Sequence, residues 1–424
     1  MPSGKLPAMD ETPLLGSRDG LGIADLHSHL PMHIAPTAAG VRYAPGLVRD
    51  RWRHVLVSLV GRFGNLEGAA KTPRVSTELL SRGGVRIALS VLYLPLDEMV
   101  FSPQWHLWEL RRRERRFHWA PPSRTAFNRL LRQLESVERH VAGLDRVVVV
   151  RGEEQLDRAL EGGRIALVHC VEGAFHLSHA PSVDRAVAEL ARRGVAYITI
   201  GHLFFRSVAT VAPSWATISE RRWNALWPQP DIGLTEAARA VIRAMVREGV
   251  LVDLTHLSAR ALEETFELLD ELDPRRRAPV LVSHGALRFG ELEYNLSPQT
   301  VERIAARDGV IGLIASAAHL RDGTGEPPPV SFEQTKQLLF RHLDRLRELT
   351  GSHRHAAIGT DLGGFISPAP GLENAACLAH LRGALTERYG EADAELICSA
   401  NVIRLLRSRW RAGSGGSPPP GDGP

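Results

Sequence analysis

Short apolar runs rich in β-branched residues alternate with helical patterns along most of this chain. The nine runs read GIADLHSH, VRIALSVLYL, VVVV, RIALVHCVE, VAYITIGH, VLVDLTH, PVLVSHG, GVIGLIAS and HAAIGTDL. Such an alternation predicts βα units and a parallel sheet. Nine runs exceed a (β/α)₈ barrel by one, and we expect the VVVV run at 147–150 to pair outside the closed sheet. The predicted fold class is α/β, a (β/α)₈ TIM-type barrel.

The segments between these runs carry their own signals. In TEAARAVIRAMVREG, Thr235 precedes an amphipathic run and Gly249 follows it, as is typical of a helix N-cap and a helix end. Two long polar segments, residues 31–80 and 96–125, interrupt the alternation after the first two strands, on the rim where barrel active sites lie. We interpret them as insertions that form walls or lids.

The length of the chain fits a single domain with insertions. Its 424 residues, of which 44% are hydrophobic, suffice for one large core. We predict a flexible segment over residues 1–20 and one barrel domain over residues 21–410. The Gly/Ser/Pro-rich end, residues 411–424, is predicted to be a disordered tail.

Charge and cysteine content indicate which kinds of partner and which cellular compartment to expect. The 52 basic and 48 acidic residues are too evenly balanced to indicate nucleic-acid binding. The stretch WHLWELRRRERRFHW at 105–119 has interleaved arginines and aromatics, but we favour a solvated or lid segment over a nucleic-acid surface. Three scattered cysteines indicate a reducing compartment, and no apolar stretch has the length of a signal peptide or membrane span. We expect a soluble, cytoplasmic protein without a membrane partner.

A histidine pair closes the first apolar run. His27 and His29 stand two residues apart in ADLHSHL. On a strand their side chains share one face, so both imidazoles can reach one metal ion inside a barrel. A second pair, His353 and His355, precedes the last run, and there we favour a solvated loop.

Two further histidines and a glutamate extend the metal hypothesis. His256 and His284 each close an apolar run. One buried histidine at such a point is more often a satisfied core group, but two in successive strands favour a metal site. A two-metal site needs an anionic bridge, and because no lysine ends a run, we expect Glu172 to supply it. By strand parity His169 points outward, toward the helices.

Carboxylates at other strand ends complete the candidate site. Asp361 precedes Gly363 and Gly364, which allow backbone or substrate to approach closely. We interpret Asp361 as the group that takes a proton from the attacking water and returns it to the leaving amine; the alternative is an N-cap or turn aspartate. Asp25 and Asp253 precede candidate ligands and are interpreted as structural or ligand-orienting groups.

These motifs resemble those of the renal (membrane) dipeptidase family, peptidase family M19, within the amidohydrolase superfamily. The resemblance runs from about residue 22 to 407 and keeps the family's order. The family's DGHND, VEG, DLxHxS, SH and GxDFDG motifs correspond here to DLHSH, VEG, DLTHLS, SH and GTDLGG. The resemblance implies a barrel of the metal-dependent hydrolase type.

Residue roles carry over by position in these motifs. The resemblance implies one metal bound by His27 and His29, a second bound by His256 and His284, and a bridge from Glu172. It also implies that Asp361 is the catalytic acid/base. His202, in ITIGHLFF, resembles the family histidine that contacts the substrate carbonyl or its oxyanion, with a buried strand-end histidine as the alternative.

The sequence departs from the family pattern at three positions. His29 stands where the family has an aspartate, and Gly363 stands at the second aspartate of GxDFDG. The arginine that binds the substrate carboxylate in the family falls at Tyr294, and a tyrosine cannot replace a guanidinium fork. Arg288, a few residues earlier, is a candidate to compensate; the alternative is a surface helix residue.

We therefore predict a binuclear metal-dependent hydrolase, a metallo-dipeptidase or amidohydrolase that uses two divalent ions, with zinc the expected metal. Its predicted substrates are dipeptides or dipeptide-like small molecules. The absent arginine keeps open another small amide or lactone, such as an N-acyl amino acid or a natural-product peptide. A non-catalytic barrel would require the loss of a ligand, and none is lost. By analogy with the family, the protein is expected to form a homodimer.

Overall fold

A ring of parallel strands forms the centre of the computed structural model, which describes residues 22–34, 73–94, 98, 122–177, 180–215 and 218–413. The strands are ordered β2-β1-β9-β8-β7-β6-β5-β4, and a further pairing of β2 with β4 closes the ring. Their bounds are β1 Ile23–Ser28, β2 Val85–Leu92, β4 Ile165–Glu172, β5 Tyr197–Thr199, β6 Leu251–Asp253, β7 Val280–Gly285, β8 Val310–Leu313 and β9 Ala356–Ile358. The predicted (β/α)₈ barrel is confirmed.

The remaining strand, β3 (Val147–Val149), lies outside the ring. It pairs with the first residues of β4, whereas β5 pairs with the last residues of β4, and β2 pairs along the opposite edge. This is the VVVV run that the alternation predicts to be supernumerary.

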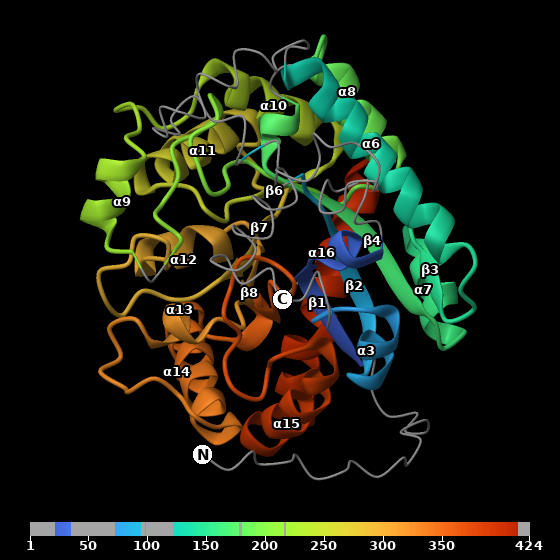
Figure 1. The fold of residues 1–424 in the computed structure, drawn as a ribbon, viewed down its shortest axis with the longest axis vertical. Coiled ribbons are helices and arrows are strands. Elements are labelled where there is room, and N and C mark those ends of the chain that lie inside the picture. The colour runs from blue at the N-terminus through green and yellow to red at the C-terminus, as the bar shows by residue number, and fades with distance from the viewer. Residues whose placement is uncertain are drawn as a thin grey trace, which may run out of the picture.

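Helices surround the ring, as Figure 1 shows, with α6, α7 and α8 along one side and α13, α14 and α15 along another. Their bounds are α1 Leu30–Ile34, α3 Thr77–Arg82, α6 Pro122–Val141, α7 Glu153–Glu161, α8 Val183–Arg192, α9 Glu220–Leu226, α10 Glu236–Glu248, α11 Ala259–Leu272, α12 Pro298–Ala305, α13 Ala317–Arg321, α14 Phe332–Thr350, α15 Leu378–Glu395 and α16 Asn401–Gly413. The predicted caps of α10 are confirmed, because Thr235 accepts a hydrogen bond from Ala238 N and Gly249 is left-handed with φ 66°. Of the helices described, none combines the length and the apolarity that a membrane crossing requires.

The two ends of the barrel are covered differently. At the amino-terminal end, α16 lies across the strand starts: Arg409 donates to Val195 O at 3.0 Å and Asn401 donates to Ala356 O at 2.8 Å. All residues of β1 and β4 are buried, with one face inside the barrel and the other against helices. The carboxyl-terminal end of the barrel is the end where the polar side chains described below gather.

Several sequence predictions lie outside the described residues. These are the flexible segment 1–20, the Arg- and Trp-rich stretch 105–119, most of the two insertions, and the tail beyond Gly413. The predicted tail begins within α16, whose helix extends to Gly413. Within the insertions the structure describes residues 31–34, 73–80, 98 and 122–125, which include most of α1 and the starts of α3 and α6.

Candidate metal centre

The structure brings the predicted ligands together at the carboxyl-terminal end of the barrel. His27 lies in β1 and His29 directly after it, Glu172 ends β4, and His284 lies in β7. His256 follows β6 by three residues and has a positive φ of 69°. All five are buried. Parallel strands that end at one rim explain why residues so distant in sequence meet.

Two groups of potential ligands share Glu172. Within each group the ligand atoms lie within 4.8 Å of one another; one group is His27, His29 and Glu172, and the other is Glu172, His256 and His284. The Oε1 atom of Glu172 lies 3.2 Å from Nε2 of His27 and 3.6 Å from Nε2 of His256. Tetrahedral zinc with bonds near 2.0 Å holds its ligand atoms about 3.3 Å apart, so these spacings fit a metal ion.

Unpartnered atoms at the centre of the cluster also fit a metal. Among the described residues, Nε2 of His27 and both carboxylate oxygens of Glu172 are buried without a hydrogen-bond partner. Such atoms are costly unless an ion or water satisfies them. Burial lowers the pKa of His256 and of His284, so both are neutral imidazoles, the form that binds metal.

Two of the histidines are oriented by partners on their other ring nitrogen. Nδ1 of His27 lies 2.9 Å from the Tyr197 hydroxyl, which itself donates to Leu26 O. Nδ1 of His284 lies 3.0 Å from Ser283 Oγ, which donates to Asp253 Oδ2 at 2.7 Å. A proton on each Nδ1 leaves Nε2 free to face the cluster. Asp253 therefore acts on His284 through Ser283.

Asp25 has a different place from Asp253. Its Oδ1 accepts from Thr360 N at 2.9 Å and its Oδ2 accepts from the Thr360 hydroxyl at 2.7 Å, which joins β1 to the end of β9. Burial raises the pKa of Asp25 to about 6. No group of possible ligands in the described chain contains it.

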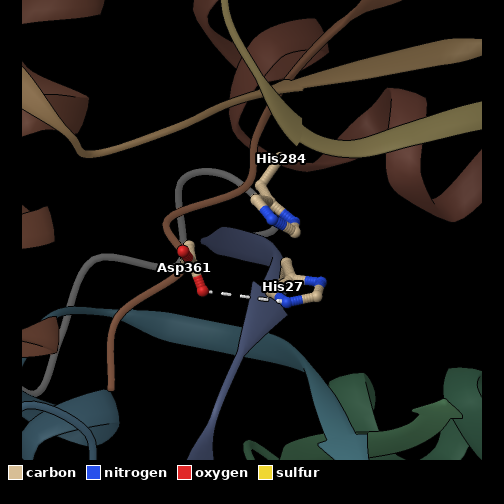
Figure 2. A group of neighbouring side chains, drawn as sticks. All are labelled: His27, His284 and Asp361. Carbon is tan, nitrogen blue, oxygen red and sulfur yellow. Dashed lines mark ion pairs between the residues drawn. The ribbon is translucent and has the colours of Figure 1, made fainter. Parts of the chain in front are cut away.

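Asp361 faces the cluster from the loop after β9. Figure 2 shows its carboxylate directed toward His27 and near His284, and Oδ1 lies 3.1 Å from Nε2 of His29. Its backbone N donates to His27 O at 2.9 Å, and its φ of 56° is unusual for a residue with a side chain. A Cβ at Gly364 would lie 2.0 Å from the Asp361 carboxylate, so this glycine leaves the space that the side chain occupies.

His202 lies at the edge of the cluster and links it to a residue that sequence analysis missed. Its Nε2 is 3.3 Å from Glu172 Oε2, and its Nδ1 is 2.5 Å from Glu98 Oε2. Burial alone would lower the pKa of His202, but the Glu172 and Glu98 carboxylates outweigh it and raise the pKa to about 9. Glu98 lies in a segment without strand or helix periodicity, so no sequence signal could have identified it.

A small pocket opens beside the cluster. It is lined by the polar residues His29, His202, Ser214, His256, Tyr294, His319 and Asp361, and by the apolar residues Leu203, Trp215, Ile314, Phe365 and Ile366. His319 is a second residue that sequence analysis missed, because it lies within a helix and outside every motif. Its Nε2 lies 2.9 Å from Ser214 O, which ties together two walls of the pocket.

The two predicted substrate contacts differ in position. Tyr294 lines the pocket, and its hydroxyl donates to His284 O at 2.9 Å. Arg288 is not among the residues that line this pocket. Its guanidinium donates to the Asn295 carbonyl at 2.8 Å and to the Glu293 carbonyl at 2.6 Å, and so braces a loop.

The remaining histidines named from the sequence lie away from the cluster. His169 points toward α6, 3.9 Å from Glu138, as strand parity predicts, and burial lowers its pKa to about 3. The prediction of a solvated loop for His353 and His355 is wrong. Both are buried in a short 3₁₀ turn, where Nδ1 of His353 lies 3.1 Å from Asp393, because the turn packs under the last helices.

Comparison with known proteins identifies the family. The model of the membrane dipeptidase family (peptidase family M19) matches residues 64–412. The chain belongs to this family. An uncharacterized dipeptidase of Schizosaccharomyces pombe is 26% identical over 254 residues, 59% of this chain and 54% of that protein. The dipeptidase tcpJ of Claviceps purpurea is 27% identical over 265 residues, 62% of this chain and 55% of that protein. The chain thus spans a little over half the length of these curated relatives.

A solved metallopeptidase structure has a similar fold. A metallopeptidase from Rhodobacter sphaeroides, liganded with a phosphinate mimic of the dipeptide L-Ala-D-Ala, is 20% identical with a TM-score of 0.65, covering 92% of this chain and all (100%) of that chain. At this identity the likeness shows the fold alone. Membership of the membrane dipeptidase family, together with the His/Glu groups at the barrel end, supports a metal cofactor.

Proposed function

We propose that this protein is a metal-dependent hydrolase that cleaves the amide bond of dipeptides or dipeptide-like small molecules. One observation carries the proposal: the buried Glu172 carboxylate is shared by two pairs of histidines at the carboxyl-terminal end of a barrel. A shared carboxylate between two ligand groups is the arrangement that a binuclear hydrolase needs. Membership of the membrane dipeptidase family and the dipeptidases among its relatives support the same activity.

The donor atoms suit two divalent ions, and we propose zinc. His27 and His29 would hold one ion and His256 and His284 the other, with Glu172 between them. Imidazole nitrogens with one carboxylate are typical zinc ligands. When bound, such ions would polarise the amide carbonyl and lower the pKa of a bound water toward about 7.

The protein's own groups would manage the protons and the developing charge. The Asp361 carboxylate, whose Oδ1 lies 3.1 Å from Nε2 of His29, would accept a proton from the attacking water and pass it to the leaving amine. His202 carries a proton at neutral pH, because its pKa is raised to about 9, and its Nε2 faces the same space. It can therefore donate a hydrogen bond to the oxyanion that forms from the carbonyl.

A second candidate follows from the walls of the pocket. The described residues that line it include no arginine or lysine to pair with a substrate carboxylate. Tyr294 donates to a backbone carbonyl, and Arg288 is held by two others. We keep as the alternative a substrate without a free carboxylate near the pocket, such as an N-acyl compound, a lactone or a natural-product peptide.

Compartment and assembly form a further part of the proposal. All three cysteines are free, which supports the reducing environment of the cytoplasm. A homodimer is proposed on the family resemblance alone, and gel filtration with light scattering would test it.

Hydrolysis of a dipeptide panel by zinc-loaded protein tests the activity. The panel should include L- and D-residues at the carboxyl terminus, and each peptide should be paired with its C-terminal amide. We expect cleavage by the wild type and a fall in kcat of about 10²–10⁴-fold for Asp361→Asn with metal retained, since this variant removes the proton acceptor. Cleavage of amides but not of free acids would favour the second candidate. Inactivity of metal-loaded wild type on the whole panel would refute the dipeptidase proposal.

A further inference from the structure

Glu98 is held by three hydrogen bonds in the interior of the protein. Its Oε2 accepts from the Tyr93 hydroxyl at 2.7 Å and lies 2.5 Å from Nδ1 of His202. Its Oε1 accepts from the backbone N of Phe204 at 3.1 Å. The Glu98 side chain has no exposed surface. These contacts fix both carboxylate oxygens in place.

The His202 ring spans the distance between two carboxylates. Nδ1 meets Glu98, and Nε2 lies 3.3 Å from Glu172 Oε2 in the candidate metal centre. The rings of Tyr93 and His256 pack edge-on against it, each with a centroid distance of 4.7 Å. A rotation of the imidazole would break the Glu98 contact and turn Nε2 away from the centre.

We propose that Glu98 is a positioning residue, which holds Nδ1 of His202 so that Nε2 faces the carbonyl of the bound amide. This inference rests on the proposed hydrolase function and deepens it. Removal of a carboxylate that orients a metal-ligating histidine commonly costs 10- to 100-fold in activity, and we expect an effect of similar size where the oriented histidine faces the substrate. Tyr93 and Phe204 in turn hold the carboxylate, so its position does not depend on His202 alone.

The charges around Glu98 agree with an ionised carboxylate. Burial opposes ionisation, but His202 and Arg206 outweigh it and lower the pKa of the Glu98 carboxyl. Glu98 therefore accepts a hydrogen bond from His202 as an anion, and such bonds are shorter and stronger than those between neutral groups.

The competing explanation is a purely structural role. Glu98 also ties its own segment to the residues after β5 through Phe204, and the loss of that tie could lower activity by loosening the pocket. A suitable control is Glu264, which accepts from the backbone N of Gly233 and of Leu234 and likewise braces a loop. Glu264 is not among the residues that line the pocket.

The test compares Glu98→Leu with Glu264→Leu in zinc-loaded, full-length protein. For Glu98→Leu we expect kcat to fall about 10- to 100-fold with KM nearly unchanged, since a positioning residue acts on the transition state. Glu98→Gln keeps one oxygen that can accept from Nδ1 and should recover part of kcat. In a His202→Gln background, Glu98→Leu should cause no further loss, because residues that act through one another are not additive. An equal loss in both backgrounds, or the same loss for Glu264→Leu, would overturn the inference.

A crystal structure of zinc-loaded Glu98→Leu supplies a readout that does not depend on turnover. We expect the His202 ring to rotate or move, so that Nε2 no longer faces Glu172. An unmoved ring would overturn the positioning role even if kcat falls. If the ring moves but the wild type cleaves no dipeptide, the proposed function fails while the positioning of His202 by Glu98 stands.

Discussion

At the scale of single residues, Glu172 is the group on which the site depends. Besides His27 and His256, three other imidazoles place Nε2 near its oxygens: His202 at 3.3 Å, His29 at 3.4 Å and His284 at 3.8 Å. Burial would raise the pKa of Glu172, but His202, His27 and His29 outweigh it and hold the pKa well below its usual value. Glu172 is therefore an anion at neutral pH, which is the form that the proposed bridging role requires.

Replacement of this anion should change the metal content. Glu172→Gln keeps the shape of the side chain but removes its charge, so we expect the metal content to fall from the proposed two zinc ions per chain to one or none. Elemental analysis of dialysed protein measures this directly, with kcat/KM as the second readout. His353→Asn, which alters a buried histidine outside the cluster, should keep both ions. Two ions retained by the Glu172 variant would exclude Glu172 as the bridge.

The sequence predicted some of these residues and not others for a physical reason. His27, His256 and His284 each end a run of strand residues, and parallel strands bring their ends to one rim, so periodicity alone indicates that they meet. Glu98 lies within a predicted insertion and His319 within a short helix, and in neither place does strand periodicity indicate where the side chain points. Their positions depend on packing that no local pattern encodes.

At the scale of elements, the loops that follow the strands position the chemistry, and buried polar contacts brace them. His342 on α14 illustrates this: its Nδ1 accepts from the backbone N of Leu287 at 3.0 Å, after β7, and its Nε2 donates to Leu320 O at 2.8 Å, at α13. The ring must be neutral to make both bonds, because Nδ1 acts as an acceptor. Burial lowers the pKa of His342 to about 4.

This histidine predicts a loss of stability in mild acid. The folded-state pKa of about 4 lies below the ordinary histidine pKa of 6.5, so as pH falls below 6.5 the unfolded chain gains a proton that the folded chain cannot take up. Between pH 7.5 and 5 the free energy of unfolding should fall by about 2 kcal/mol through this group. His342→Gln should reduce that fall by a similar amount, although it lowers stability at pH 7.5.

Urea unfolding at several pH values, followed by tryptophan fluorescence, measures how the free energy of unfolding depends on pH. His140→Gln, at an exposed position on α6, is the matched control and should keep the wild-type pH dependence. Parallel pH profiles for wild type and His342→Gln would show that the contact does not depend on the neutral ring.

At the scale of the whole molecule, the same strands form the barrel and position the candidate site. The candidate ligands lie in or directly after β1, at the end of β4, in the loop that follows β6, and in β7. Asp361 follows β9. Closure of the ring therefore assembles the site. The alternation of runs was sufficient to predict this ring and the exclusion of β3. The alternation could not predict the course of the loops that carry pocket residues, because contacts between segments far apart in the chain set that course.

Because closure of the barrel also assembles the candidate metal site, metal binding should contribute to the stability of the whole barrel. Without an ion, the two ligand groups bury a carboxylate and imidazole nitrogens that have no hydrogen-bond partners among the described residues. An ion at about 1,000 times its Kd would stabilise the folded state by about 4 kcal/mol. We expect chelation to lower Tm by roughly 5 °C or more and zinc to restore it. His256→Asn, which removes one candidate ligand, should reduce that difference. Identical Tm values for metal-free and zinc-loaded protein would mean that the ligand cluster is held by packing alone.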